Sequence, residues 1–163
     1  MIERYSRKEL KDIWSEENKY KIWLEVEIAA AEAMEKFKMI PKGVSSIVKK
    51  KGKIKVKRIH DIEAKVKHDV IAFLTSITEQ AGIKARYLHQ GMTSSDVLDT
   101  SFNIQLMQSG KIILNDIDKI LIVLKRQAKK YKMTPCIGRS HGIHAEPITF
   151  GLKLASFYEE FKR

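Results

Sequence analysis

The sequence has one cysteine, Cys136, in 163 residues, and it has no long hydrophobic run. A single thiol cannot form an internal disulfide, so nothing points to an oxidising compartment. Apolar residues make up 44% of the chain and charged residues 31%. This is too much apolar material for a disordered tail and too much charge for a membrane span. Residues 1–10 also lack the apolar stretch of a secretory signal. We therefore expect a globular cytoplasmic protein with no membrane partner.

Acidic residues are scarce relative to basic ones. The chain has 20 Asp and Glu against 31 Lys and Arg, which gives a formal net charge of +11. Such a charge favours anionic partners of any kind. The densest basic block, residues 49–58, contains no aromatic residue on which a base could stack. We interpret this block as a solvated lysine-rich connection and expect no specific nucleic acid partner, with a basic nucleic-acid-binding helical protein as one alternative.

Helical spacing of apolar residues is the main structural signal and predicts an all-α fold. Ser6 and Glu9 have the spacing of a capping box, which predicts a helix that begins near Ser6. Ser94 or Ser95 is the expected cap of a later helix that Gly110 interrupts. Apolar residues recur at helical spacing in five further stretches, which are residues 20–37, 59–66, 70–77, 113–131 and 154–161.

Two domains are expected, an amino-terminal helical domain over residues 1–110 and the start of a long-helix bundle over residues 111–163. The helix over 113–131 carries apolar side chains on several faces, which favours a multi-helix or inter-subunit bundle. Residues 134–149 contain two prolines and two glycines and are interpreted as an irregular loop with a short extended piece. The chain ends within helical spacing and without a stop signal, so we expect a truncated portion of a longer protein.

Polar residues that packing does not explain fall in loops or at helix starts. In a helical protein these ends can meet in one cleft, where backbone amides and the helix dipole favour anions. Hydroxyls and cations in such a cleft would hold carboxylate or phosphate groups. The residues concerned are Arg4-Tyr5, His68-Asp69, His89, Thr93 to Asp96, and Ser140 to His144.

Three of these segments together resemble adenylosuccinate lyases, within the fumarase and aspartase superfamily. They are KHDV at 67–70, GMTSSD at 91–96 and GRSHGIHAEP at 138–147, and the start at 1–5 agrees as well. The resemblance implies an elimination that releases fumarate from adenylosuccinate, giving AMP, and from the succinyl-carboxamide ribotide of purine synthesis. It implies a small-molecule nucleotide substrate, no metal or organic cofactor, and a homotetramer whose active sites each draw on three chains.

The implied reaction removes a proton beside a carboxylate, so its site needs a base, charge-stabilising donors and an acid for the leaving nitrogen. By its place in the motif, His141 is the implied general acid, a role that suits the pKa range of imidazole. His68 is implied to lie near the reacting nitrogen as a second catalytic residue. The family's base lies in a serine-containing loop that would follow Arg163, so we expect the isolated chain to be inactive.

The remaining implied site residues bind substrate. Thr93, Ser94 and Ser140 are implied to donate to the succinyl carboxylates, although Thr93 and Ser94 are equally suited to helix capping. Ser140 stands where the family more often has Thr, which keeps the hydroxyl. Arg4 and Tyr5 are implied to contact the phosphate, for which guanidinium can form paired hydrogen bonds.

Lys67 and Asp69 complete the implied substrate-contacting triplet around His68. His89 is implied to face the nucleotide, with a purely structural histidine as the alternative.

Two other functions are weighed against this one. Cys136, His141 and His144 are close in sequence, but zinc sites use more ligands in recognised spacings, so no metal is expected. A non-catalytic helical interaction module is the alternative if the chain is complete, with an exposed bundle face as its binding surface.

Overall fold

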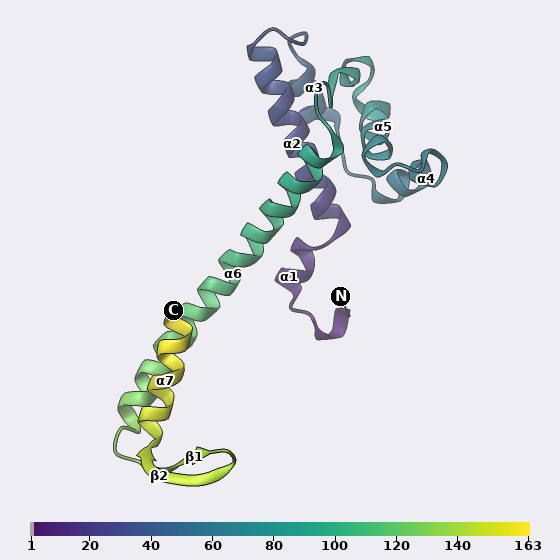
Figure 1. Ribbon diagram of the computed structural model, residues 1–163. Helices are drawn as coiled ribbons and strands as arrows, with labels where there is room; N and C mark the ends of the chain where they lie inside the picture. Colours follow the sequence, from purple (N-terminus) through teal and green to yellow (C-terminus); the bar gives the residue numbers. More distant parts are fainter. Residues whose placement is uncertain (1) are drawn as a thin grey trace. The chain divides into compact units, whose positions relative to one another are not determined.

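The computed structural model describes residues 2–163 (Figure 1). Met1, the first residue of the start that resembles adenylosuccinate lyases, lies outside the described residues. The chain divides into two compact units, one that ends at Ser109 and one that covers Gly110–Arg163. The elements in chain order are η1 (Glu3–Tyr5), α1 (Lys8–Ile13), α2 (Glu16–Lys36), α3 (Val44–Lys51), α4 (Val56–Val66), α5 (Asp69–Ala81), η2 (Ile83–Tyr87), α6 (Ser94–Lys130), β1 (Pro135–Ser140), β2 (Ile143–Thr149) and α7 (Phe150–Lys162).

The all-α prediction is confirmed, with one short β-hairpin as a minor addition. The predicted helices over 20–37, 59–66, 70–77 and 154–161 correspond to α2, α4, α5 and α7, with small differences at their ends. Within residues 2–163, no helix is both long enough and apolar enough to traverse a bilayer.

The core of the first unit is built around three aromatic side chains. The rings of Tyr20 and Phe73 stack with centroids 5.9 Å apart, and Trp23 meets them edge-on at 5.1 and 5.5 Å. The buried indole Nε1–H of Trp23 donates a hydrogen bond of 2.9 Å to the Ser101 hydroxyl. Helices α2, α5 and α6 are therefore fixed to one another, with Val44, Val48, Ile59, Val70, Ile77 and Val97 buried around them.

Helix α3 was not predicted, because the group that caps it lies on another helix. Its N-cap, Gly43, has no side chain, and the carboxylate of Glu35 on α2 accepts from the backbone N–H of Gly43 at 3.0 Å and of Ser45 at 2.6 Å. These backbone hydrogen bonds hold the pKa of Glu35 below its ordinary value.

The interpretation of residues 49–58 as a connection is wrong for most of the block. Lys49 to Lys51 close α3, where cations suit the helix dipole, and residues 56–58 begin α4. Arg58 pairs with Glu79 of α5, with Nε 2.9 Å from Oε2. Only residues 52–55 connect the two helices.

Two predicted helix signals are wrong. Ser6 does not cap α1, because its hydroxyl donates to the Ile2 carbonyl at 2.8 Å and the helix begins at Lys8. Gly110 does not interrupt α6, which runs unbroken for 37 residues. One glycine inside a helix costs about 1 kcal/mol, which the rest of a long helix can absorb.

The prediction of an irregular loop at 134–149 is wrong apart from its extended piece, because nearly all of the segment forms the antiparallel hairpin of β1 and β2. Strand pairing runs from Pro135 opposite Thr149 to Ser140 opposite Ile143, with a register shift between Ile137 and Arg139. A two-residue turn closes it, with φ of 52° at His141 and 74° at Gly142. Two consecutive positive φ angles are typical of the type I′ turn, whose twist matches that of paired strands.

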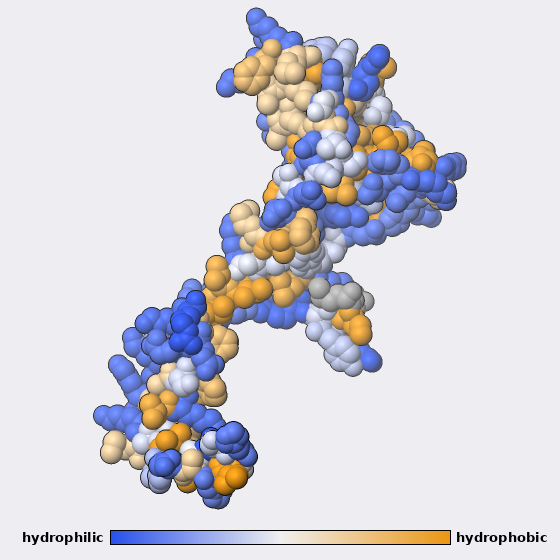
Figure 2. All heavy atoms as spheres, in the orientation of Figure 1, coloured by the Kyte–Doolittle hydropathy of each residue, from blue (hydrophilic) through white to orange (hydrophobic). Residues whose placement is uncertain are grey.

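Helix α7 packs against the end of α6 through a close backbone approach (Figure 1). A Cβ on Gly151 would lie 2.5 Å from the Ala128 carbonyl oxygen, so only glycine fits there. The Gly151 N–H donates to the Tyr131 carbonyl at 3.0 Å, and the rings of Tyr131 and Phe150 lie 5.5 Å apart. Hydrophobic side chains remain visible along α6 in Figure 2; after Gly110 the exposed ones are Ile113, Leu114, Ile120, Ile122 and Val123.

The two glycines predict opposite effects of the same substitution. Gly110→Ala should raise the free energy of unfolding by about 0.5–1 kcal/mol, because its Cβ would meet open space inside a helix. Gly151→Ala should lower it by about 1–3 kcal/mol, because its Cβ would collide with backbone. Urea unfolding followed by circular dichroism measures both. Equal effects of the two changes would contradict the packing of α7 on α6.

Candidate functional site

The Lys67–Asp69 segment forms the junction between α4 and α5. Lys67 ends α4 with a left-handed backbone, φ 55°, and its N–H donates to the Glu63 carbonyl at 2.8 Å. His68 is the N-cap of α5, and its Nδ1 accepts a long hydrogen bond of 3.4 Å from the Ile71 N–H. The same Nδ1 also lies 3.5 Å from Oδ1 of Asp69. The carboxylate of Asp69 accepts from the Val70 N–H at 2.7 Å, and the side chains of His68 and Asp69 are roughly half exposed.

His89 lies in the turn between η2 and α6 and is held by a buried acid that the sequence interpretation missed. One oxygen of Glu27 accepts from the His89 backbone N–H at 2.8 Å, and the other lies 2.7 Å from Nδ1. The Glu27 side chain is fully buried, whereas 15% of the His89 side chain is exposed. Burial raises the pKa of Glu27, and its bonds to His89 oppose that rise.

Thr93 and Ser94 stand at the start of α6, and the predicted capping by Ser94 or Ser95 is wrong. The helix begins at Ser94, and the capping carboxylate is that of Asp96, which accepts from the Thr93 N–H at 2.8 Å. The Asp96 N–H donates to the Thr93 carbonyl at 3.1 Å. The hydroxyls of Thr93 and Ser94 make no hydrogen bond within residues 2–163, so they remain available to a ligand at a helix N-terminus.

Ser140 and His141 lie at the tip of the hairpin in the second unit. Ser140 ends β1 opposite Ile143, and His141 is the first turn residue. Both side chains are exposed, and so is that of His144 on β2. The imidazole of His141 is therefore not enclosed in an apolar interior.

Arg4 and Tyr5 lie in η1 and are both exposed. The Arg4 guanidinium lies 4.7 Å from the centre of the Tyr5 ring, a cation–π distance. No hydrogen bond within residues 2–163 joins this pair to Lys67–Asp69 or to Thr93–Ser94. These three groups belong to the first unit, and Ser140 and His141 belong to the second.

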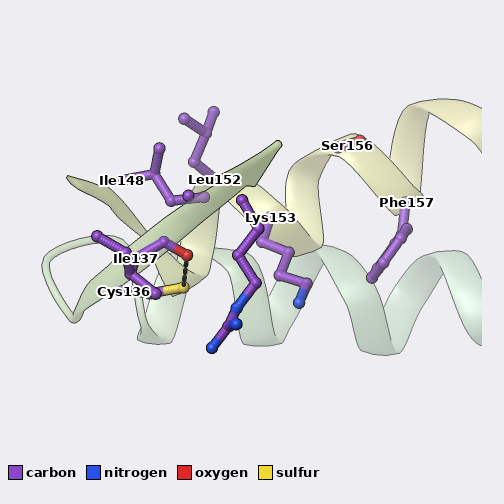
Figure 3. A pocket seen from close by; sticks show the side chains of 9 residues that line it. Cys136, Ile137, Ile148, Leu152, Lys153, Ser156 and Phe157 are labelled. Carbon is purple, nitrogen blue, oxygen red and sulfur yellow. Dashed lines mark hydrogen bonds between the residues drawn. The ribbon is translucent and has the colours of Figure 1, made fainter. Parts of the chain in front are cut away.

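Asp69 and side chains between Leu98 and Gln105 of α6 line one cleft of about 290 Å³ in the first unit, together with Lys19 and Trp23 of α2. A second cleft, of about 510 Å³, lies between the hairpin and α7 (Figure 3). Its wall is largely apolar, with Arg139 and Lys153 as its cations. The second cleft includes neither Ser140 nor His141, so it is separate from the predicted residues.

No group of three or more His, Cys, Asp or Glu side chains within residues 2–163 is arranged to hold a metal ion. Cys136, His141 and His144, although close in sequence, do not form such a group.

A left-handed backbone marks three of the predicted site residues. Four residues other than glycine have positive φ in residues 2–163, namely Lys38, Lys67, His89 and His141. This conformation costs a residue with a Cβ about 1–2 kcal/mol, and glycine largely avoids the cost. Backbone strain of this kind gathers at functional sites, which favours a role for the side chains that occupy these positions.

Comparisons with known proteins agree with the resemblance seen in the sequence. A family model described as "Lyase" matches residues 3–163. Adenylosuccinate lyases from Thermotoga maritima and Bacillus subtilis are 48% and 44% identical to this chain over all 163 residues. The chain spans 38% of the length of each. A crystal structure of a fumarate lyase from Mesorhizobium sp. BNC1 matches 94% of the chain and 37% of its own length, with a TM-score of 0.88 and 26% identity.

The left-handed backbone at His141 predicts that glycine at this position is more stabilising than alanine. The free energy of unfolding of His141→Gly should be about 1 kcal/mol higher than that of His141→Ala. Both variants lack the imidazole, and only glycine adopts the positive φ without a steric cost. Lys38→Gly and Lys38→Ala form the matched pair at a position outside the predicted site and should differ in the same direction. Urea denaturation gives the four values. Alanine and glycine of equal stability at residue 141 would mean that the turn is not left-handed in solution.

Proposed function

Because the chain belongs to the lyase family, whose model matches residues 3–163, we propose that it is the part of an adenylosuccinate lyase that carries the general acid and much of the substrate-binding surface. The observation that carries the proposal is identity of 48% and 44% to adenylosuccinate lyases in matches that extend over all 163 residues. The three motif segments and their order support the same assignment.

In the proposed reaction, a base takes a proton from the carbon beside a carboxylate of the succinyl group. The bond from the neighbouring carbon to the purine nitrogen breaks, and its electrons move to the nitrogen as fumarate forms. His141 gives its proton to that nitrogen, so AMP leaves neutral at this atom. Its place on an exposed hairpin turn supports this role, because the imidazole is free to meet a bound ligand. The same elimination on the succinyl-carboxamide ribotide is part of the proposal.

Thr93, Ser94 and Ser140 are the proposed donors to the succinyl carboxylates. Support comes from the start of α6, where Asp96 performs the capping and leaves both hydroxyls unbonded within residues 2–163. The N-terminal end of a helix also carries partial positive charge, which suits a carboxylate. Carboxylate binding therefore requires no rearrangement of the helix start.

Phosphate and base contacts are assigned to the remaining residues. Arg4 and Tyr5 are the proposed phosphate ligands, since guanidinium and phenol both donate to phosphate oxygens. His89 is proposed to face the nucleotide. Lys67, His68 and Asp69 are proposed to contact the substrate, with His68 near the reacting nitrogen. The contacts of its Nδ1 with Ile71 and Asp69 leave Nε2 as the ring nitrogen that can face a ligand.

The proposal extends to a homotetramer in the cytoplasm whose active sites combine residues of several chains. Support comes from the exposed apolar face of α6 after Gly110, where Ile113 is 51% and Ile122 is 68% exposed. A face of this kind favours burial in a helical bundle.

His141→Ala, in a chain that spans the full length of the relatives, should lower kcat by roughly 10²–10⁴-fold, because the leaving nitrogen loses its acid. Substrate binding should remain measurable. The matched control is His60→Ala, an exposed histidine of α4 outside the predicted site, which should keep kcat within about two-fold of the parent. Fumarate formation is followed by absorbance, and near-normal turnover of His141→Ala would remove it from the acid role.

Arg4→Ala should weaken AMP binding by about 10–100-fold and fumarate binding hardly at all, because only the nucleotide carries a phosphate. Lys8→Ala is the control for the loss of one nearby exposed cation. Isothermal titration of the two products measures both affinities. Equal losses for AMP and fumarate would contradict the phosphate assignment.

A further inference from the structure

Glu27 is a carboxylate placed among core side chains. It lies one helical turn from Trp23 and from Ala31, both of which are buried, and its own side chain is fully buried. A buried carboxylate is costly unless it is paired and hydrogen-bonded. Every hydrogen bond recorded for this carboxylate comes from a single residue, His89, 62 positions along the chain.

The two bonds from Glu27 fix both the backbone and the ring of His89. One carboxylate oxygen holds the backbone N–H at 2.8 Å, and the other holds Nδ1 at 2.7 Å. The residue has a left-handed backbone, φ 62°, and its carbonyl accepts from the Met92 N–H at 3.3 Å. The imidazole therefore has a set orientation before any ligand arrives.

The chemistry of the pair also fixes which ring nitrogen is free. A carboxylate accepts hydrogen bonds and does not donate them, so Nδ1 of His89 carries a hydrogen. Nε2 makes no hydrogen bond to any residue in the range 2–163, and 15% of the side chain reaches the surface.

We propose that Glu27 is a positioning residue that holds the His89 ring in one orientation, with its Nε2 presented to the phosphate of a nucleoside monophosphate. This rests on the proposed function, in which His89 faces the nucleotide. Glu27 does not touch the ligand, and it acts through the orientation of His89. Arg4 and His89 then contact the same class of anion.

The first test reads the ring itself and needs no ligand. In ¹⁵N spectra of the histidine side chains of this 163-residue chain, Nδ1 of wild-type His89 should be protonated. Glu27→Gln keeps the shape of the side chain and replaces one carboxylate oxygen with an amide, so the His89 ring signals should shift. The matched control is Glu16→Gln, because Glu16 pairs with His60 at 3.0 Å on the surface. It should leave the His89 signals unchanged.

An unprotonated Nδ1 in wild-type His89 would overturn the proposal, because a carboxylate could not then be its partner. So would ring signals of His89 that are the same in Glu27→Gln as in the wild type. The wild-type spectrum decides the first point even if the variant does not fold.

The second test measures affinity for AMP and for adenosine, which differ by the phosphate. Glu27→Gln and His89→Gln should each weaken AMP binding by about ten-fold or more and change adenosine binding by less than about two-fold. If His89→Gln weakens AMP binding and Glu27→Gln does not, the role of Glu27 is wrong and the proposed function stands. If neither weakens it, or if the wild type binds AMP no more tightly than adenosine, the assignment of His89 to the phosphate is wrong as well.

Discussion

A buried carboxylate must find partners inside the protein, and this requirement at Glu27 organises the turn that precedes α6. Its two oxygens are used by the backbone and the ring of His89, so the chain at 89 cannot move away from α2 without leaving an unpaired charge in the core. The same turn leads to Thr93 and Ser94. A constraint in the core therefore sets where the first residues of α6 present their hydroxyls.

Periodicity predicted the helices whose packing face lies in one continuous stretch, because a buried stripe leaves a direct trace in the sequence. It failed where the deciding partner is distant. Helix α3 depends on Glu35 of α2 for its cap, and nothing near Gly43 records that bond. The prediction at Ser6 failed for a local reason, because its hydroxyl donates to the nearby Ile2 carbonyl and does not accept from a free helix amide. Local capping signals are reliable only when no other polar group competes for them.

The hairpin and Gly110 show two further limits of local rules. Glycines and prolines at 134–149 were interpreted as irregular, yet Gly142 serves the tight turn and Pro135 and Pro147 lie within paired strands. Gly110 carries a real cost in α6, and cooperativity with the rest of the helix overrides it. A helix-propensity cost near 1 kcal/mol at one residue does not end a helix that many other residues stabilise.

Motif residues were easier to find than the residues that orient them. The sequence predicted His89 as a site residue because it is a polar residue in a loop. It did not predict Glu27, because this residue is one of several acids on a charged helix. Its spacing from Trp23 and Ala31 was the available signal, since an acid on the buried stripe must have a partner. The consequence is visible in two histidines of the first unit. Nδ1 of half-exposed His68 lies 3.4 Å from the Ile71 N–H and 3.5 Å from an Asp69 oxygen, whereas Nδ1 of His89 lies 2.7 Å from a fully buried carboxylate. The neighbours of Nδ1, which no motif specifies, therefore decide how firmly each ring is oriented.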